Sequence, residues 1–232
     1  MNAAIQLAGV TKCFGERVAL NAISATIPTG GITGLVGPDG AGKSTLLRLL
    51  AGLLVPEAGE IRVLGLDPVR EGDALRQRLG YMPQQFGLYE DLSVQENLNL
   101  YADLRGVLEP ERSPTFERLL AFTDLARFTA RPAGKLSGGM KQKLGLACAL
   151  LGTPDVLLLD EPGVGVDPIS RRALWKMVRE LAQGGMTVLW STAYLDEAEL
   201  CDHVLLMADG EVRTSGTPAT LMGAMASRCW LL

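Results

Sequence analysis

The sequence predicts an α/β protein whose mainly parallel sheet is joined by an antiparallel β subdomain and an inserted helical subdomain. Residues 1–30 alternate short apolar and polar pieces, the pattern of half-exposed antiparallel strands. From Gly31 onward, short apolar runs are followed by helical stretches, which indicates parallel strands covered on both faces. Between Gln84 and Lys135, strand signals disappear and helix signals dominate. We therefore expect an antiparallel subdomain at 1–30, an α/β core at 31–83 and 152–220, and a helical subdomain at 84–151, which includes the helix after the glycine-rich segment 136–140.

Local signals place the individual elements. The buried strands are expected at Ile32–Val36, Val156–Leu159, Thr187–Trp190 and Val204–Met207. In the helical stretch, Ser93-Val94-Gln95-Glu96 is a capping box, because the serine can cap a new helix while the glutamate reaches back to it. Gly106 is placed to end that helix, and Pro114 is expected at the first position of the next one.

Composition and charge narrow the class of protein. The net charge of −4 argues against a protein that holds nucleic acid on a general basic surface. No uninterrupted apolar stretch reaches the roughly 18 residues of a membrane-spanning helix, so we expect any membrane role to depend on a partner. None of the cysteines has CxxC spacing, which predicts reduced thiols rather than disulfides or a metal site. These cysteines are Cys13, Cys148, Cys201 and Cys229.

The segment GPDGAGKST follows a buried strand and opens a helix expected at Lys43–Ala51. This strand–loop–helix context is the one that the GxxxxGK[ST] phosphate-loop pattern requires, so the core is expected to be a P-loop NTPase. Lys43 can reach the β- and γ-phosphates, the Ser44 hydroxyl can bind Mg²⁺, and Thr45 can donate to the α-phosphate. The expected ATP-binding residues of the loop are Gly37, Pro38, Asp39, Gly40, Ala41, Gly42, Lys43, Ser44 and Thr45.

Two acidic residues follow the buried strand Val156–Leu159. At the end of a parallel strand they are expected to point into the ligand crevice. Asp160 would bind the Mg²⁺ shell through water, and Glu161 would polarise the attacking water in a phosphoryl-transfer reaction. Solvated acids at a strand end are the alternative.

A second glycine-rich segment, Leu136-Ser137-Gly138-Gly139-Met140, precedes a helix expected at Lys141–Leu151. Ser137, Gly138 and Gly139 expose backbone donors at a helix N-terminus, which makes a second anion site. A chain with one phosphate loop has no obvious need for a second phosphate-binding helix end of its own. The need arises if this helix end contacts the nucleotide that another subunit holds. With GPDGAGKST, Tyr81-Met82-Pro83-Gln84, LLLDEP and Val166-Asp167-Pro168 in the same order, the chain resembles the ABC ATPase family over essentially its whole length.

The resemblance implies roles for further residues. Phe14 matches the aromatic residue that stacks on adenine, with a core phenylalanine as the alternative. Gln84, rather than its neighbour Gln85, matches the glutamine that touches Mg²⁺ and the attacking water. Asp167 matches an aspartate that crosses the dimer interface; it can also cap the helix that Pro168 begins, and both can be true.

The chain departs from the family pattern at three positions. Met140 stands where glutamine is usual, and LSGGMKQK resembles the ATPases of ABC-2-type exporters. Gly163 stands where threonine or serine is usual. Ala193, in STAYLDEAE, replaces the histidine that hydrogen-bonds the γ-phosphate in the family. The single histidine, His203, lies beyond the following helix, and the adjacent Tyr194 is expected to point elsewhere.

The resemblance implies a function and partners. We expect an ATPase that uses ATP and Mg²⁺ at a dimer interface, at the cytoplasmic face of the membrane, with a second ATPase domain and transmembrane permease subunits and no nucleic acid. Its own site is expected to hydrolyse slowly because of Ala193; the alternative is that water or Tyr194 replaces the histidine and both sites turn over alike. The segment Gln84–Glu96, with Phe86 and Tyr89, is expected to dock the permease. The strand-like Ser227–Leu232 suggests the first half of a longer, tandem polypeptide.

Two alternatives to this reading stay open. The chain could be a regulatory half that binds ATP, completes the partner's site and rarely hydrolyses ATP itself. It could also be an ABC protein without a transport role that acts on ribosomes or DNA, although the acidic balance and the exporter-like LSGGM count against that alternative.

Overall fold

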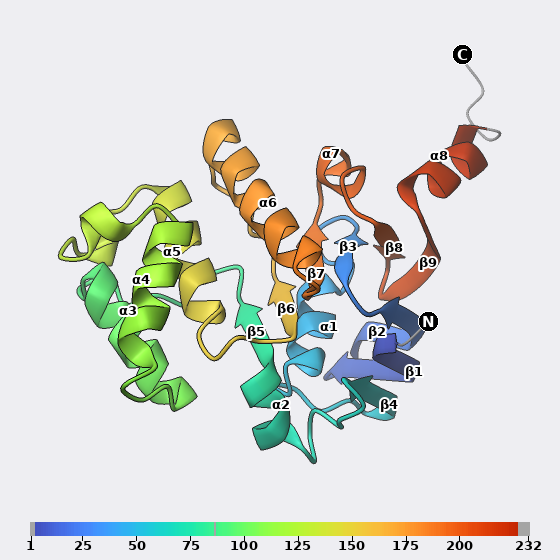
Figure 1. Ribbon diagram of the computed structural model, residues 1–232. Helices are drawn as coiled ribbons and strands as arrows, with labels where there is room; N and C mark the ends of the chain where they lie inside the picture. Colours follow the sequence, from blue (N-terminus) through green and yellow to red (C-terminus); the bar gives the residue numbers. More distant parts are fainter. Residues whose placement is uncertain (1–2, 86, 227–232) are drawn as a thin grey trace.

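The computed structural model describes residues 3–85 and 87–226, and two sheets form the frame of this part of the chain (Figure 1). One sheet has three antiparallel strands in the order β2-β1-β4, and the other has six strands in the order β5-β6-β7-β3-β8-β9. The strands from β5 to β8 run parallel, and only β9 joins the large sheet in the opposite direction. The predicted α/β class with a mainly parallel core is therefore confirmed.

The strands of the two sheets are β1 (Ala3–Phe14), β2 (Arg17–Pro28), β3 (Gly31–Val36), β4 (Ala58–Val63), β5 (Leu79–Met82), β6 (Val156–Leu159), β7 (Thr187–Thr192), β8 (His203–Ala208) and β9 (Glu211–Gly216). The α-helices are α1 (Lys43–Leu50), α2 (Gly72–Arg78), α3 (Val94–Arg105), α4 (Arg112–Phe122), α5 (Gly138–Ala149), α6 (Pro168–Gln183), α7 (Leu195–Ala198) and α8 (Pro218–Ala226). Two single-turn 3₁₀ helices lie at Ala126–Phe128 and Ala133–Lys135.

The central strands are apolar throughout because the sheet is buried on both faces. Along β6, Leu157 and Leu159 belong to one core, whereas Val156 and Leu158 belong to the other. The second core also contains the buried leucines of α1 and the inward residues of β1 and β2, so α1 lies between the two sheets. The first core contains the apolar residues of α3, α5 and α6.

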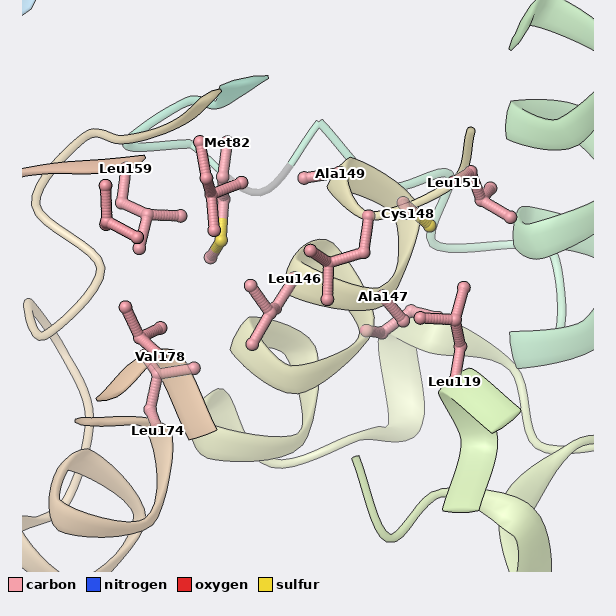
Figure 2. Packing of buried hydrophobic residues seen from close by; sticks show 14 of the residues in the cluster. Met82, Leu119, Leu146, Ala147, Cys148, Ala149, Leu151, Leu159, Leu174 and Val178 are labelled. Atoms are coloured by element: carbon pink, nitrogen blue, oxygen red, sulfur yellow. The ribbon is translucent and has the colours of Figure 1, made fainter. Parts of the chain in front are cut away.

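The helical subdomain packs on the first core through α5. Figure 2 shows Leu146 of α5 on the side that faces Met82 of β5, Leu159 of β6 and Val178 of α6. At the entrance to the subdomain, α3 begins with the expected capping box: Glu96 N donates to Ser93 Oγ at 3.2 Å, and Ser93 N donates to Glu96 Oε2 at 2.7 Å. Gly106 ends α3 in the left-handed conformation, as predicted.

The structure corrects several of the expected boundaries. The antiparallel sheet takes its third strand from β4, inside the stretch 31–83 that was expected to belong to the core, because Ile61 and Val63 face the same interior as β1. Strands β4, β5 and β9 were not predicted. Helix α4 begins at Arg112, so Pro114 is its third residue, and α5 begins at Gly138, three residues earlier than expected.

The cysteines are free thiols where the structure describes them, at Cys13, Cys148 and Cys201. Burial raises the pKa of Cys201 to about 12 and raises that of Cys148 further, so both stay protonated. Cys229 and the strand expected at 227–232 lie outside the described residues, as does Phe86. Within 3–85 and 87–226, none of the helices combines the length and the apolar character needed to span a bilayer.

Candidate functional site

The site lies at the carboxyl edge of the large sheet, where four parallel strands end side by side. The phosphate loop follows β3, Gln84 follows β5, Asp160 and Glu161 follow β6, and Ala193 follows β7. In a parallel sheet these ends share one edge, which is where open α/β folds bind their ligands. Residues that are more than 100 positions apart in the sequence, such as Ser44 and Asp160, are thereby brought into contact.

The phosphate loop needs glycine at positions where the backbone is crowded. A Cβ on Gly37 would overlap the carbonyl oxygen of Met207. Gly42 has φ +102°, and a Cβ there would lie 2.6 Å from Leu20 Cδ2. Gly42 is also the N-cap residue of α1, whose free backbone N–H groups and dipole favour an anion.

Lys43 is buried and ties the loop to the carboxylate pair. Its Nζ donates to the carbonyl oxygens of Gly37 at 2.8 Å and Pro38 at 3.0 Å. The same Nζ lies 3.1 Å from Glu161 Oε1, and both side chains are less than a tenth exposed. The ammonium group is therefore held at the mouth of the loop by three oxygens that a phosphate group can replace.

Ser44 and Ser191 hold Asp160 from two sides. Ser44 Oγ and Ser191 Oγ each donate to Asp160 Oδ1 at 2.9 Å. Burial raises the pKa of Asp160, and the two serine hydrogen bonds act in the opposite direction by stabilising the carboxylate. Ser191 also accepts a hydrogen bond from Glu161 N at 2.8 Å. Sequence reasoning missed Ser191, although a serine near the end of an apolar strand was a usable signal.

Glu161 has an unusual backbone and a polar neighbour. Its φ is +50°, a left-handed conformation that non-glycine residues rarely adopt and that is frequent at functional sites. Gln84 Nε2 donates to Glu161 Oε2 at 2.7 Å, so the structure brings Gln84 into the site as expected. Gln85 does not line the cleft described below.

The residues expected to hold Mg²⁺ fit a hard divalent cation. Asp160 Oδ2 is buried and has no hydrogen-bond partner, while the Ser44 hydroxyl contacts the other oxygen of the same carboxylate. An unpartnered buried carboxylate oxygen costs free energy unless a cation or water satisfies it. Oxygen ligands from one carboxylate plus substrate phosphates are the set that Mg²⁺ prefers.

The site opens into a cleft of about 450 Å³. Its wall includes Phe14 and Arg17, which face each other across the turn between β1 and β2. Phe14 is 49% exposed, which excludes the alternative of a core phenylalanine; its contact with adenine stays a prediction. Lys12 Nζ lies 5.4 Å from the centre of the Phe14 ring. Arg17 reaches over the loop at Gly40 and was missed by sequence reasoning, which had no signal for it.

A larger cavity, of about 730 Å³, lies at the opposite edge of the sheet. Its lining includes Asp155 and Thr187, which stand at the amino ends of β6 and β7, and Leu119 and Phe122 of α4. It contains none of the phosphate-loop residues and neither Asp160 nor Glu161. Phosphate-loop residues and Glu161 therefore line the smaller cleft and not this cavity.

The second glycine-rich segment does not contribute to this cleft. None of Ser137, Gly138, Gly139 and Asp167 is among the described residues that line it. Ser137 caps α5 by accepting from Met140 N at 3.3 Å. Asp167 caps α6 by accepting from Ile169 N at 3.1 Å and Ser170 N at 2.9 Å, and hydrogen bonds from Ser170 lower its pKa. The capping role of Asp167 is confirmed; its role towards a second subunit stays a prediction.

Ala193, the residue directly after β7, has no side-chain group that can donate a hydrogen bond. Tyr194 is 42% exposed, and its ring lies 5.3 Å from the guanidinium carbon of Arg171, so it does not line the cleft. His203 stands at the first position of β8, where it pairs with Thr33 near the start of β3 rather than with Val36 at its end. Neither Tyr194 nor His203 lines the cleft.

Comparisons with known proteins assign this arrangement to a family. A family model described as ABC transporter matches residues 20–164, which include the phosphate loop, the glycine-rich signature and both acids. The chain belongs to the ABC transporter family. Binding of ATP and membership of the ATPase class follow from the family, as predicted.

Similar proteins come from export systems. The chain is 61% identical over 233 residues to the probable multidrug ABC transporter ATP-binding protein YbhF of Escherichia coli, a match that covers 100% of this chain and 40% of the relative. It is 40% identical to a Nod factor export ATP-binding protein I of a Rhizobium species, covering 94% of this chain and 72% of the relative. The chain thus spans about two-fifths of the length of YbhF.

Solved structures share the fold. CbiO1 from Clostridium perfringens, part of the CbiONQ transporter complex, superposes with a TM-score of 0.86 at 28% identity over 96% of this chain and 92% of that chain. A dimeric post-hydrolysis state of the ATP-binding cassette MJ0796, bound to ADP and Pi, gives a TM-score of 0.82 at 28% identity over 92% and 98% of the two chains.

Proposed function

We propose that the chain is the ATP-binding and ATP-hydrolysing domain of an ABC exporter of the ABC-2 type. The contact set Lys43–Glu161–Gln84 beside Ser44–Asp160 carries this proposal. The names of the relatives, which include multidrug transport and Nod factor export, support the direction of transport. The partners are a second ATPase domain and permease subunits at the cytoplasmic face of the membrane. With a net charge of −4, no nucleic acid is expected among them.

Binding begins with an exchange of partners at Lys43. In the free site the Lys43 ammonium is held by Glu161 and by two loop carbonyls. The β- and γ-phosphates take the place of Glu161, because a phosphate chain carries more charge than one carboxylate and is also bound by the helix N-terminus. The carboxylate of Glu161 is thereby released next to Gln84. ATP binding thus prepares the group that acts in hydrolysis.

Hydrolysis follows from the positions of the released groups. Glu161 accepts a hydrogen bond from the attacking water, and Gln84, 2.7 Å from the same carboxylate, orients that water towards the γ-phosphate. Ser44, Gln84 and, through water, Asp160 would hold Mg²⁺, which would supply charge neutralisation for the phosphate oxygens. Ser137, Gly138, Gly139 and Asp167 lie outside the cleft and complete the site of the second ATPase domain.

The exchange at Lys43 can be tested by nucleotide titration. A charge-assisted hydrogen bond contributes roughly 1.5–3 kcal/mol, so Lys43→Ala should weaken ATP binding by about 10- to 150-fold. Lys176→Ala is the matched control, because Lys176 is exposed on α6 and far in sequence from the loop. Affinities can be measured with a fluorescent ATP analogue. ATP affinity in Lys43→Ala equal to that of the control would remove the assignment of the site.

A second candidate function rests on Ala193. The chain could be a half that binds ATP, completes the partner's site and hydrolyses its own ATP only slowly. Ala193 has no donor for the γ-phosphate, and Tyr194 is held by Arg171 instead of facing the cleft. The two candidates differ in the hydrolysis rate at this chain's own loop within the full assembly, and a comparison of the two sites separates them.

A further inference from the structure

An arginine without a partner stands beside the phosphate loop. Arg17 is exposed and lines the cleft. In the part of the chain that the structure describes, its side chain makes neither an ion pair nor a hydrogen bond. The nearby Lys12 is different, because its Nζ lies 2.7 Å from Glu57 Oε1 and the residue does not line the cleft. The charge of Arg17 is therefore available to a ligand.

The hairpin of β1 and β2 holds Arg17 in this place. Phe14 and Arg17 are opposite residues of the hairpin, so their side chains leave it on the same face. Two residues further on, β2 packs against the loop, since a Cβ at Gly42 would lie 2.8 Å from the carbonyl oxygen of Ala19. A Cβ at Gly40 would lie 3.6 Å from Arg17 Nη2, which places the guanidinium directly beside the loop. The hairpin thus brings an aromatic ring and a cation to the same side of the cleft.

Lys43, the other basic residue that lines the cleft among the described residues, is fully occupied before a ligand arrives. Its Nζ contacts the carbonyl oxygens of Gly37 at 2.8 Å and Pro38 at 3.0 Å, and Glu161 Oε1 at 3.1 Å. These oxygens take up every N–H of the ammonium group. Lys43 is also only 3% exposed, whereas Arg17 is open to solvent. An incoming phosphate group therefore meets Arg17 before Lys43 has a donor to offer.

The charge balance of the cleft also depends on Arg17. The described residues that line it include two basic ones, Arg17 and Lys43, and two acidic ones, Asp39 and Glu161, so their formal charges cancel. Without Arg17 the lining would have an excess of negative charge. Charges act on each other over about 8 Å at physiological ionic strength, so such a lining would repel a phosphate chain at the entrance of the cleft. Arg17 removes that repulsion.

We propose that Arg17 is a phosphate-binding residue of the nucleotide site, and that its guanidinium captures the phosphate chain before Lys43 exchanges Glu161 for it. A guanidinium offers parallel N–H donors that match the oxygens of a phosphate group. Capture by Arg17 comes first, Glu161 then leaves Lys43, and the β- and γ-phosphates move onto the ammonium. This order of steps rests on the proposed function, in which the loop binds ATP.

Stopped-flow binding of a fluorescent ATP analogue separates the two cations. Arg17→Ala should lower the association rate constant by about three- to tenfold, because one steering charge is lost at the entrance. Lys43→Ala should mainly raise the dissociation rate constant, since Lys43 acts after capture. The deficit of Arg17→Ala should shrink in about 1 M salt, where the screening length falls to ~3 Å.

Three further variants control for charge and size. Arg17→Lys keeps the charge and should keep most of the association rate, whereas Arg17→Gln keeps most of the size and should behave like Arg17→Ala. Arg118→Ala is the matched control, because Arg118 is an exposed arginine of α4 that does not line the cleft. Its removal changes the net charge of the chain by the same amount and should leave the association rate unchanged.

Competition with inorganic triphosphate shows which part of the nucleotide Arg17 contacts. Triphosphate has neither a base nor a sugar, so Arg17→Ala should weaken its binding by the same factor as that of ATP. We expect this factor to be about three- to tenfold, smaller than for buried Lys43 because water and ions screen an exposed charge. Phe14→Ala should weaken the binding of ATP and leave that of triphosphate unchanged.

An association rate of Arg17→Ala equal to that of Arg118→Ala would overturn the inference. A loss of ATP affinity that triphosphate does not share would also overturn it, because Arg17 would then contact the base or the sugar. Both results leave the proposed function standing as long as Lys43→Ala weakens ATP binding. If neither Arg17→Ala nor Lys43→Ala changes ATP binding, the proposed function and the inference fail together.

Discussion

Ser191 contacts both acids of the candidate site, Asp160 and Glu161, through a single hydroxyl, so Ser191→Ala tests the geometry of the site. Its Oγ donates to Asp160 Oδ1 at 2.9 Å and accepts from Glu161 N at 2.8 Å. Ser191 is fully buried, and Asp160 is only 1% exposed. No water can therefore take over the two hydrogen bonds without a rearrangement of the strand end.

The cost of the change has two parts. A hydrogen bond to a charged group contributes roughly 1.5–3 kcal/mol, and a buried N–H that loses its acceptor costs about 1–3 kcal/mol. Allowing for relaxation, we expect Ser191→Ala to lower the free energy of unfolding by about 2–4 kcal/mol near neutral pH. The single-turnover rate of hydrolysis should fall too, because Glu161 at φ +50° loses the contact that holds its backbone.

The loss should depend on pH through Asp160. Burial raises the pKa of Asp160 above the 3.8 of an unperturbed aspartate, so the ionised carboxylate is destabilising in the fold, and Ser191 reduces that penalty. Without Ser191 the folded pKa rises further. The part of the destabilisation that comes from the Asp160 charge is fully present above the folded pKa of Asp160 in the variant. It disappears as the pH falls through that pKa and then through the folded pKa of the unaltered chain, because protonated Asp160 carries no charge to stabilise.

Urea unfolding at a series of pH values measures both effects. Ser215→Ala is the control, because Ser215 is exposed on β9, and it should change stability by less than about 0.5 kcal/mol. A Ser191→Ala variant as stable as the control would refute the reasoning, and so would a stability loss that stays constant as the pH falls.

Two further predictions concern the walls of the site and the contact with the membrane partner. Phe14→Ala should weaken ATP binding by roughly tenfold, because base stacking on an aromatic ring contributes about 1–3 kcal/mol, whereas Phe14→Tyr should not; equal affinities in a titration would exclude stacking. A cysteine at Tyr89, which is 56% exposed while Asn97 holds its backbone, should cross-link to a permease subunit in membranes. A cysteine at Val55, which is 58% exposed and lies just before β4 of the three-stranded sheet, should not cross-link to the permease. Capture of soluble proteins alone would contradict the docking surface expected at Gln84–Glu96.

The strand ends and the loop could be predicted because their sequence signals are local. A continuous apolar run followed by GPDGAGKST or by two acids specifies a strand, its burial and the group at its end without reference to the rest of the chain. The capping box at Ser93 and the C-terminal Gly106 are local in the same sense, and both were confirmed. Helix α5 began earlier than expected because Ser137 caps it, so Gly138 and Gly139 are helical although glycine has a low helix propensity.

The remaining features depend on contacts between distant segments. β4 looked like part of the core because it follows α1 in sequence, yet it pairs with β1. The position of Arg17 beside the loop depends on the turn after Phe14. The departures at Gly163 and Ala193, by contrast, were visible in the sequence.

The most direct test of the central claim is single-turnover ATP hydrolysis in the assembly with the second ATPase domain, comparing Glu161→Gln with the matching change in that domain. The account predicts two unequal phases, with Glu161→Gln removing the slower one. If the missing γ-phosphate contact resembles other charge-assisted hydrogen bonds, worth roughly 1.5–3 kcal/mol, Ala193→His should accelerate that phase by about 10- to 150-fold. Equal losses from the two changes would contradict the asymmetry, and hydrolysis unaffected by Glu161→Gln would contradict the claim that this cleft hydrolyses ATP.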